Sequence, residues 1–326
     1  MSFRHSTLSL NLKRLILIGG LMLVVLIGCT NTTPIDTGNP TGFRHRTGVF
    51  ELQAPKSWKQ VQDQVETEAL AAFSDPTGQS EIIAYAGLLD HTLTAEEGLQ
   101  LVPGLVKNLL NSPGDLAVID TQRRADGAFV VNLTFTRKDV KRAGQAVLKD
   151  GGLALSGVIA SGPQDQWTTL QTGLQPVFES FKLNPDYVQG TFFTPIEKSH
   201  FALVVPADWE RAALEEGTQV RSRNGLVTIV AAQKPLSNTL DAAAFSEAAT
   251  KAAQAYVGQA TVSASQTLPD GRLQQTLDTA SKRTISYTEL KDSMLITLLV
   301  EVPAAQAAAY QPLIDFMYST FITGKP

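Results

Sequence analysis

The sequence contains the stretch Phe50-x-Leu52-x-x-Pro55-x-x-Trp58, and the same pattern returns as Phe201-x-Leu203-x-x-Pro206-x-x-Trp209. In each copy, alternating apolar residues favour a β-strand, and the proline ends that strand before the tryptophan. Later pairs keep the same order along the chain: Asp126-Gly127 with Asp270-Gly271, and Leu148-Lys149-Asp150 with Leu290-Lys291-Asp292. This repeat predicts two copies of one domain, at 44–184 and 188–324, joined at Asn184-Pro185-Asp186.

Hydrophobic periodicity predicts the order of elements within each copy. Thr94 and Glu97 form the pattern of a helix-capping box, so a helix is expected to begin there. In the first copy we expect strands over 49–54, 69–73, 81–85, 116–121, 128–136, 140–148 and 153–160. One helix is expected to run from the Thr94 cap to residue 111, and a second over 167–181. In the second copy we expect helices over 241–256 and 304–321. The sequence therefore predicts an α+β fold: two tandem, mostly antiparallel sheets flanked by helices, each an α/β/α sandwich.

The paired tryptophans have two interpretations. Trp58 and Trp209 could each present a stacking surface to a ligand, or each could fill the core where the strand ends. Their matched positions beside Pro55 and Pro206 favour the core.

The chain resembles the PsbP-like superfamily, including DcrB-like and related actinobacterial lipoproteins. The resemblance rests on the strand–Pro–x–x–Trp opening, the Phe73-Ser74-Asp75-Pro76 hairpin, the capped helix after it and the closing Phe-x-x-Phe helix. It implies a PsbP-like fold in both copies and a non-catalytic accessory, assembly or binding role. The resemblance brings no catalytic residue set. The second copy departs from the pattern, with Arg223-Asn224-Gly225 at the first hairpin.

The N-terminus has the pattern of a lipoprotein signal peptide. Arg4, Lys13 and Arg14 precede the apolar run at 15–28, which is too short to cross a hydrocarbon core of about 30 Å as a helix. The run ends in Leu26-Ile27-Gly28-Cys29, which resembles the bacterial lipobox. That resemblance implies a signal peptide at 1–28 and a lipid such as palmitate on Cys29; a buried cysteine on an ordinary helix is the alternative. Residues 29–43, rich in Thr, Asn, Pro and Gly, are expected to form a flexible tether.

Composition and motifs exclude several classes of function. The chain has 27 basic and 31 acidic residues, a net charge of −4, so no nucleic-acid partner is expected. Its single cysteine excludes an internal disulfide and a cysteine-built metal site. His45, His91 and His200 lack zinc-site spacing, and we expect them on the surface. We found no nucleophile elbow or phosphate-binding loop, and therefore predict no catalytic residue, metal or cofactor.

One basic segment differs between the copies. Arg137, Lys138, Lys141 and Arg142 place four cations on the expected hairpin tip. They are predicted to contact a partner protein or anionic lipid; a solvated turn that blocks edge aggregation is the alternative.

The sequence thus predicts a non-enzymatic, lipid-anchored interaction or assembly protein at the outer face of the cytoplasmic membrane. Its expected partners are the membrane, through Cys29, and an envelope protein. The alternative is a lipoprotein that binds a small molecule or peptide in a groove within or between the two domains.

Overall fold

The computed structural model describes residues 34–66, 68–111, 114–237 and 240–324. The apolar run at 15–28 and Cys29 lie outside these residues. From Ile35 onward the chain forms one compact unit. The domain boundaries at 44–184 and 188–324 therefore stay a prediction.

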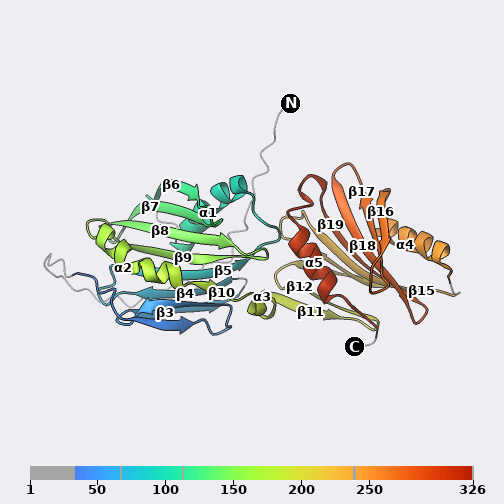
Figure 1. Cartoon of the computed structure of the whole chain (residues 1–326), viewed down its shortest axis with the longest axis horizontal. Coiled ribbons are helices and arrows are strands. Elements are labelled where there is room, and N and C mark those ends of the chain that lie inside the picture. Colours follow the sequence, from blue (N-terminus) through green and yellow to red (C-terminus); the bar gives the residue numbers. More distant parts are fainter. Residues whose placement is uncertain (1–33, 67, 112–113, 238–239, 325–326) are drawn as a thin grey trace, which may run out of the picture. The chain divides into compact units, whose positions relative to one another are not determined.

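The N-terminal sheet has seven strands, and every pairing in it is antiparallel. Their order is β3 (Lys59–Val65), β4 (Glu68–Ser74), β5 (Glu81–Leu88), β9 (Ala154–Pro163), β8 (Val140–Asp150), β7 (Phe129–Arg137) and β6 (Ala117–Arg123). Helix α2 (Trp167–Ser180) lies across the near face in Figure 1, packed on β9 and β8. Helix α1 (Ala95–Leu109) packs on β6 and β7, and a separate apolar cluster fills the space beneath it.

The C-terminal sheet repeats this strand order with its own seven antiparallel strands. They are β13 (Glu210–Leu214), β14 (Gly217–Arg221), β15 (Thr228–Pro235), β19 (Met294–Pro303), β18 (Lys282–Lys291), β17 (Leu273–Asp278) and β16 (Thr261–Thr267). Helix α4 (Ala242–Val257) packs on β17, β18 and β19. On β12 and β19 lies α5 (Gln311–Thr320), preceded by the short 3-10 helix η2 (Ala304–Gln306). The predicted α+β class with mostly antiparallel sheets is confirmed.

Two small sheets contain the repeated tryptophan motif. One is β1 (Pro40–Arg44), β2 (Phe50–Pro55) and β10 (Lys182–Leu183); the other is β11 (Phe193–Glu197), β12 (Phe201–Pro206) and β20 (Ile322–Thr323). Both tryptophans that follow these strands are buried, so the core interpretation of Trp58 and Trp209 is confirmed. The Trp58 indole also donates from Nε1 to the carbonyl of Asp36 at 2.7 Å.

The predicted tether at 29–43 is wrong in its last part. Residues 40–44 form strand β1, which pairs with β2 throughout its length. The side chain of Ile35 packs on the core cluster beneath α2. Apolar contacts at Ile35 and Phe43, together with the backbone pairing, order a stretch whose polar composition resembled a linker.

Two further expectations about elements need correction. Strand β3 was not predicted, because its sequence KQVQDQV has no apolar alternation; it is an exposed edge strand that pairs only with β4. The helix expected over 304–321 is broken into η2 and α5. Pro312 lies in the first turn of α5, where a missing amide hydrogen costs nothing, and so marks a new helix start.

Candidate functional site

The predicted basic contact lies on the hairpin between β7 and β8. Lys138 and Asp139 form its turn with φ of 52° and 62°, and Lys138 and Lys141 are exposed. Arg137 instead turns inward. Its Nη1 donates to both carboxylate oxygens of Glu81 at 2.8 and 2.7 Å, and its Nη2 donates to the carbonyl of Leu110 at 2.8 Å. The side chain of Arg137 therefore binds the carbonyl of the residue that caps the C-terminal end of α1.

Arg142 is likewise part of the interior. Its side chain is 6% exposed, its Nη1 lies 3.6 Å from Glu81, and its Nη2 donates to the carbonyl of Gly78 at 3.3 Å. The Ser161 hydroxyl donates to the same Glu81 carboxylate at 3.0 Å. The four-cation surface is thus corrected to Lys138 and Lys141, because Arg137 and Arg142 share the charge of Glu81. Cys29, the predicted lipidation site, lies outside the described residues.

The prediction of three surface histidines is wrong for two of them. His45 is buried beside Phe50, with ring centroids 4.7 Å apart, and its Nε2 lies 3.2 Å from Asp63. Burial is the main cause that lowers its pKa. His91 is 14% exposed and stacks on the ring of Tyr310 at 4.9 Å. The surroundings of His91 make the candidate site.

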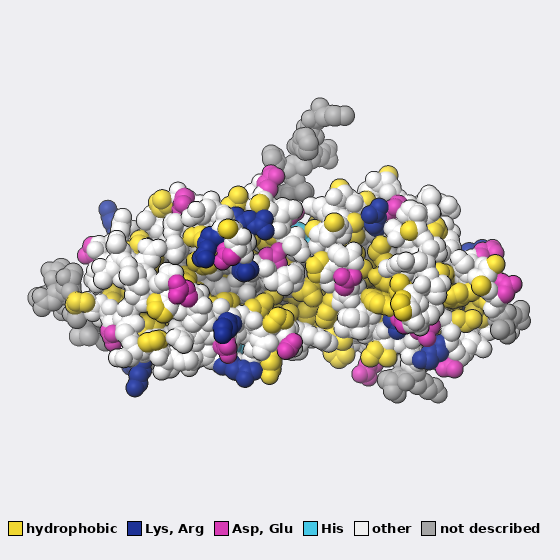
Figure 2. All heavy atoms as spheres, in the orientation of Figure 1, with side chains coloured by type: hydrophobic (Ala, Val, Ile, Leu, Met, Phe, Trp, Pro, Cys, Tyr) yellow, Lys and Arg dark blue, Asp and Glu magenta, His cyan; other side chains and the backbone are white. Residues whose placement is uncertain are grey.

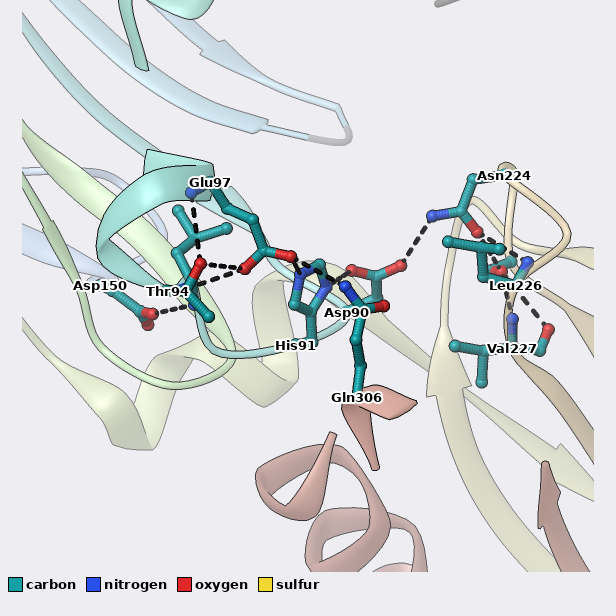
Figure 3. Close-up of polar contacts among 11 residues, drawn as sticks. Asp90, His91, Thr94, Glu97, Asp150, Asn224, Leu226, Val227 and Gln306 are labelled. Atoms are coloured by element: carbon teal, nitrogen blue, oxygen red, sulfur yellow. Dashed lines mark hydrogen bonds and ion pairs between the residues drawn. The ribbon is translucent and has the colours of Figure 1, made fainter. Parts of the chain in front are cut away.

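The segment that holds His91 is fixed by its own backbone contacts. Thr94 and Glu97 form the predicted capping box: the Thr94 amide donates to Glu97 at 2.9 Å, and the Glu97 amide donates to the Thr94 hydroxyl at 3.2 Å. The Leu93 amide donates to Asp150 of β8 at 2.7 Å. The Glu97 carboxylate therefore has a defined position at the start of α1 (Figure 3).

His91 lies between two carboxylates. Its Nδ1 is 2.6 Å from Asp90 Oδ1, and its Nε2 is 3.5 Å from Glu97 Oε1. The hydrogen bond to Asp90 is the largest cause that raises the pKa of His91, and the charges of Asp90 and Glu97 act in the same direction. Burial and the same two carboxylates raise the pKa of Tyr310, so this phenol stays neutral.

The same two carboxylates also bind residues of the C-terminal half. Asn224 Nδ2 donates to Asp90 Oδ2 at 3.0 Å, and Gln306 Nε2 donates to Glu97 Oε1 at 3.1 Å. A backbone bond of 2.9 Å joins the Thr92 amide to the carbonyl of Ala309. Figure 3 shows both side-chain bonds reaching Asp90 and Glu97 from segments far away in sequence. We name this cluster, made of Asp90, His91, Glu97, Asn224, Gln306 and Tyr310, the His91 cluster.

The strength of the contacts within the His91 cluster depends on the charges of its side chains. An imidazole between two carboxylates can hold a proton, and amide side chains can bond to the carboxylates. In the ranges that the structure describes, no three His, Cys, Asp or Glu residues are placed to hold a metal ion. Sequence reasoning missed this cluster; the one available signal was the acidic Asp90 beside His91, just before the Thr94–Glu97 box.

A surface depression of about 490 Å³ lies in the C-terminal half. Its polar residues already bond one another: Arg272 lies 3.3 Å from Glu289, Lys291 donates to the carbonyl of Thr323 at 2.9 Å, and Tyr318 donates to Asp270 at 2.6 Å. Lys291 thus binds the final strand β20, and the other polar groups are paired with one another. Figure 2 shows the molecular surface with its side chains coloured by type.

Comparison with known proteins gives structural similarity without a family. No model of a known protein family matches the sequence, and no curated protein matches it. Among the described residues, no helix is long and apolar enough to cross a membrane.

Several solved structures resemble the chain, including these three. Cyanobacterial PsbP (CyanoP) from Synechocystis sp. PCC 6803 is 17% identical with a TM-score of 0.34, over 48% of this chain and 98% of that one. LpqN, involved in cell envelope biogenesis of Mycobacterium tuberculosis, is 18% identical with a TM-score of 0.31, over 45% and 91%. A Bacteroides thetaiotaomicron VPI-5482 protein is 11% identical with a TM-score of 0.29, over 50% and 52%.

Proposed function

We propose that this chain is a non-enzymatic lipoprotein of the bacterial cell envelope, with a PsbP-like fold, that acts as an interaction or assembly factor. A lipid on Cys29 holds it at the outer face of the cytoplasmic membrane. The observation that carries this proposal is the order of Arg4, Lys13 and Arg14, the apolar run at 15–28, and Gly28-Cys29. One lipid chain gives only marginal membrane binding, so the proposed anchor carries at least two.

The start of the folded chain supports an anchored position. Ile35 packs on the core and comes only six positions after Cys29 in the sequence. A chain of that length extends at most about 20 Å, at roughly 3.5 Å per residue. The β7–β8 hairpin lies at the end of the N-terminal sheet where β3 begins. Across neighbouring strands, Lys59 of β3 pairs with Ser74 of β4, Ser74 with Glu81 of β5, and Glu81 with Ser161 of β9, which lies beside β8. Lys138 and Lys141 are therefore proposed to lie near the membrane.

The anchor is tested by replacing the cysteine in the full chain. Cys29→Ala is expected to move the protein from the detergent phase to the aqueous phase, because the thiol that carries the lipid is gone. Mass spectrometry of the N-terminal peptide should show an acylated Cys29 in the unsubstituted protein. Thr33→Ala is the matched control and should stay in the detergent phase. An unmodified Cys29 peptide, or an unchanged partition of the alanine variant, would contradict the anchor.

The interaction surface is tested by photo-crosslinking in intact cells. A photoreactive residue replacing Lys138 is expected to capture an envelope protein, since Lys138 is exposed on the hairpin turn. The control position is Lys251 on α4, whose side chain is exposed and paired with Glu247 at 2.6 Å. Lys141→Glu should reduce the crosslink from position 138 by reversing a neighbouring charge. Equal crosslinking from positions 138 and 251 would reject this surface.

A further inference from the structure

The contact between the loop at 90–97 and the C-terminal half depends on two carboxylates. Asp90 and Glu97 each accept one hydrogen bond from that half, from Asn224 and Gln306. Both carboxylates also face the ring of His91. The side chains of Asp90, His91 and Glu97 are 19%, 14% and 26% exposed, so water screens their charges only in part.

The charges around His91 do not balance when the imidazole is neutral. From its own loop and α1, the His91 ring faces Asp90 and Glu97. The C-terminal half places the neutral Tyr310 against this ring, and the neutral amides of Gln306 and Asn224 against the two carboxylates. Asp150 of β8 accepts the Leu93 amide behind the loop. The imidazolium is therefore the cation that directly contacts both carboxylates among the side chains described around this contact.

A second set of charges meets nearby at the same pair of halves. Glu68 at the start of β4 feels the charges of Arg223 and Asp208 from the C-terminal half, and Arg223 lies 2.9 Å from Asp208. Burial is the largest cause that raises the pKa of Glu68. Of the two charges from the C-terminal half, that of Arg223 lowers the pKa of Glu68 and that of Asp208 raises it, so this set gives the contact no single direction of proton dependence.

We propose that His91 makes the contact between the two halves sensitive to pH. With the imidazole protonated, its charge holds Asp90 and Glu97 where Asn224 and Gln306 bond to them, and its ring stacks as a cation on Tyr310. When His91 loses its proton, two carboxylates remain without a cation between them, and the bonds from Asn224, Gln306 and the Thr92 amide open more often.

The sign of the effect follows from linkage between proton binding and the contact. A histidine whose pKa is raised in the folded protein, here by Asp90 and Glu97 on either side of its ring, stabilises that arrangement fully below its ordinary pKa of 6.5. This stabilisation is lost as the pH rises through the raised pKa of His91. Glu97, whose pKa is lowered in the folded protein, opposes this effect only below its ordinary value of 4.5.

Hydrogen exchange at single amides tests this proposal in the full chain in detergent micelles. The Thr92 amide bonds to the C-terminal half, whereas the neighbouring Leu93 amide bonds to Asp150 within the N-terminal half. Between pH 5.5 and 8.5, the protection factor of Thr92 should fall roughly tenfold, because the closed contact then loses the free energy that the His91 proton supplies. The protection factor of Leu93 should change far less.

Two variants separate the proposal from a purely structural role. His91→Gln cannot carry the proton, so its Thr92 protection should be low and independent of pH, while His200→Gln should behave as the unsubstituted protein. Asn224→Ala with Gln306→Ala leaves His91 in place, and reciprocity requires that the pKa of His91, followed by NMR, then move down. Constant Thr92 protection from pH 5.5 to 8.5, or an unchanged His91 pKa in the double variant, would overturn the proposal.

Discussion

At the scale of single residues, the Glu81 carboxylate holds more of the N-terminal half together than its partly exposed position suggests. It accepts from Arg137 and Ser161 and lies 3.6 Å from Arg142, whose side chain is 6% exposed. Through Arg137 it also connects to the carbonyl of Leu110, the residue that caps the end of α1. Removing its charge would leave two guanidinium groups, one of them buried, to share the few remaining acceptors.

Glu81→Gln is therefore expected to lower the free energy of unfolding by about 3 kcal/mol, the cost of breaking a buried ion pair from one side. Chemical denaturation followed by circular dichroism measures the loss. Glu51→Gln, on the exposed face of β2, is the control and should change stability by less than about 0.5 kcal/mol. Equal stability of the two variants would show that Arg142 does not need Glu81. Arg142→Met, which removes the buried cation itself, should restore part of the stability to Glu81→Gln.

At the scale of elements, periodicity predicted the buried strands because their apolar residues meet a core. Strands β4, β5, β7, β8 and β9 appear where alternation or an apolar run indicated them, and the Thr94–Glu97 box begins α1 as expected. Strand β3 could not be found in this way. Its side chains are almost all exposed, so pairing with β4 alone orders it, and pairing leaves no pattern of hydrophobicity.

The candidate site escaped prediction for a related reason. Arg137 and Arg142 lie within six residues, and sequence spacing alone suggested one basic surface. The identity of their partner, Glu81, depends on the pairing of β5 with β9 and of β9 with β8, which connects residues far apart in the chain. Likewise, His91 stacks on Tyr310 and Glu97 accepts from Gln306 only when the two halves come together. Local pattern predicts which groups carry charge, whereas tertiary contact decides which of them remain free.

At the scale of the whole molecule, α3 (Pro185–Phe192) takes the place of the junction predicted at Asn184-Pro185-Asp186. The Asn184 side chain accepts the Asp186 amide as the cap of this helix. On the N-terminal side, the guanidinium of Arg44 lies over the ring of Tyr187, with its central carbon 5.0 Å from the ring centroid. On the C-terminal side, the Phe192 carbonyl accepts the Ala207 amide at 2.9 Å. A helix that contacts both halves is a stiffer connection than a three-residue linker.

One apolar cluster runs from Phe50 and Trp58 through Val188 and Phe192 of α3 to Trp209 and Phe321. Burying this shared surface couples the two halves, so both are expected to unfold in one cooperative transition near pH 6, where the His91 cluster also contributes. Trp209→Phe leaves tryptophan fluorescence to Trp58 and Trp167 of the N-terminal half. Trp58→Phe with Trp167→Phe leaves it to Trp209 of the C-terminal half.

In each tryptophan variant, the unfolding midpoint in guanidinium from fluorescence is compared with the midpoint from circular dichroism of the same sample. Any loss of stability caused by the substitution then affects both midpoints equally. The two midpoints should coincide in both variants. Separate midpoints would mean that the shared core is too weak to couple the halves. At pH 8.5, loss of the His91 proton removes one of the contacts that join them, so any separation should appear there first. In the double variant Asn224→Ala with Gln306→Ala, the two midpoints should begin to separate at a lower pH.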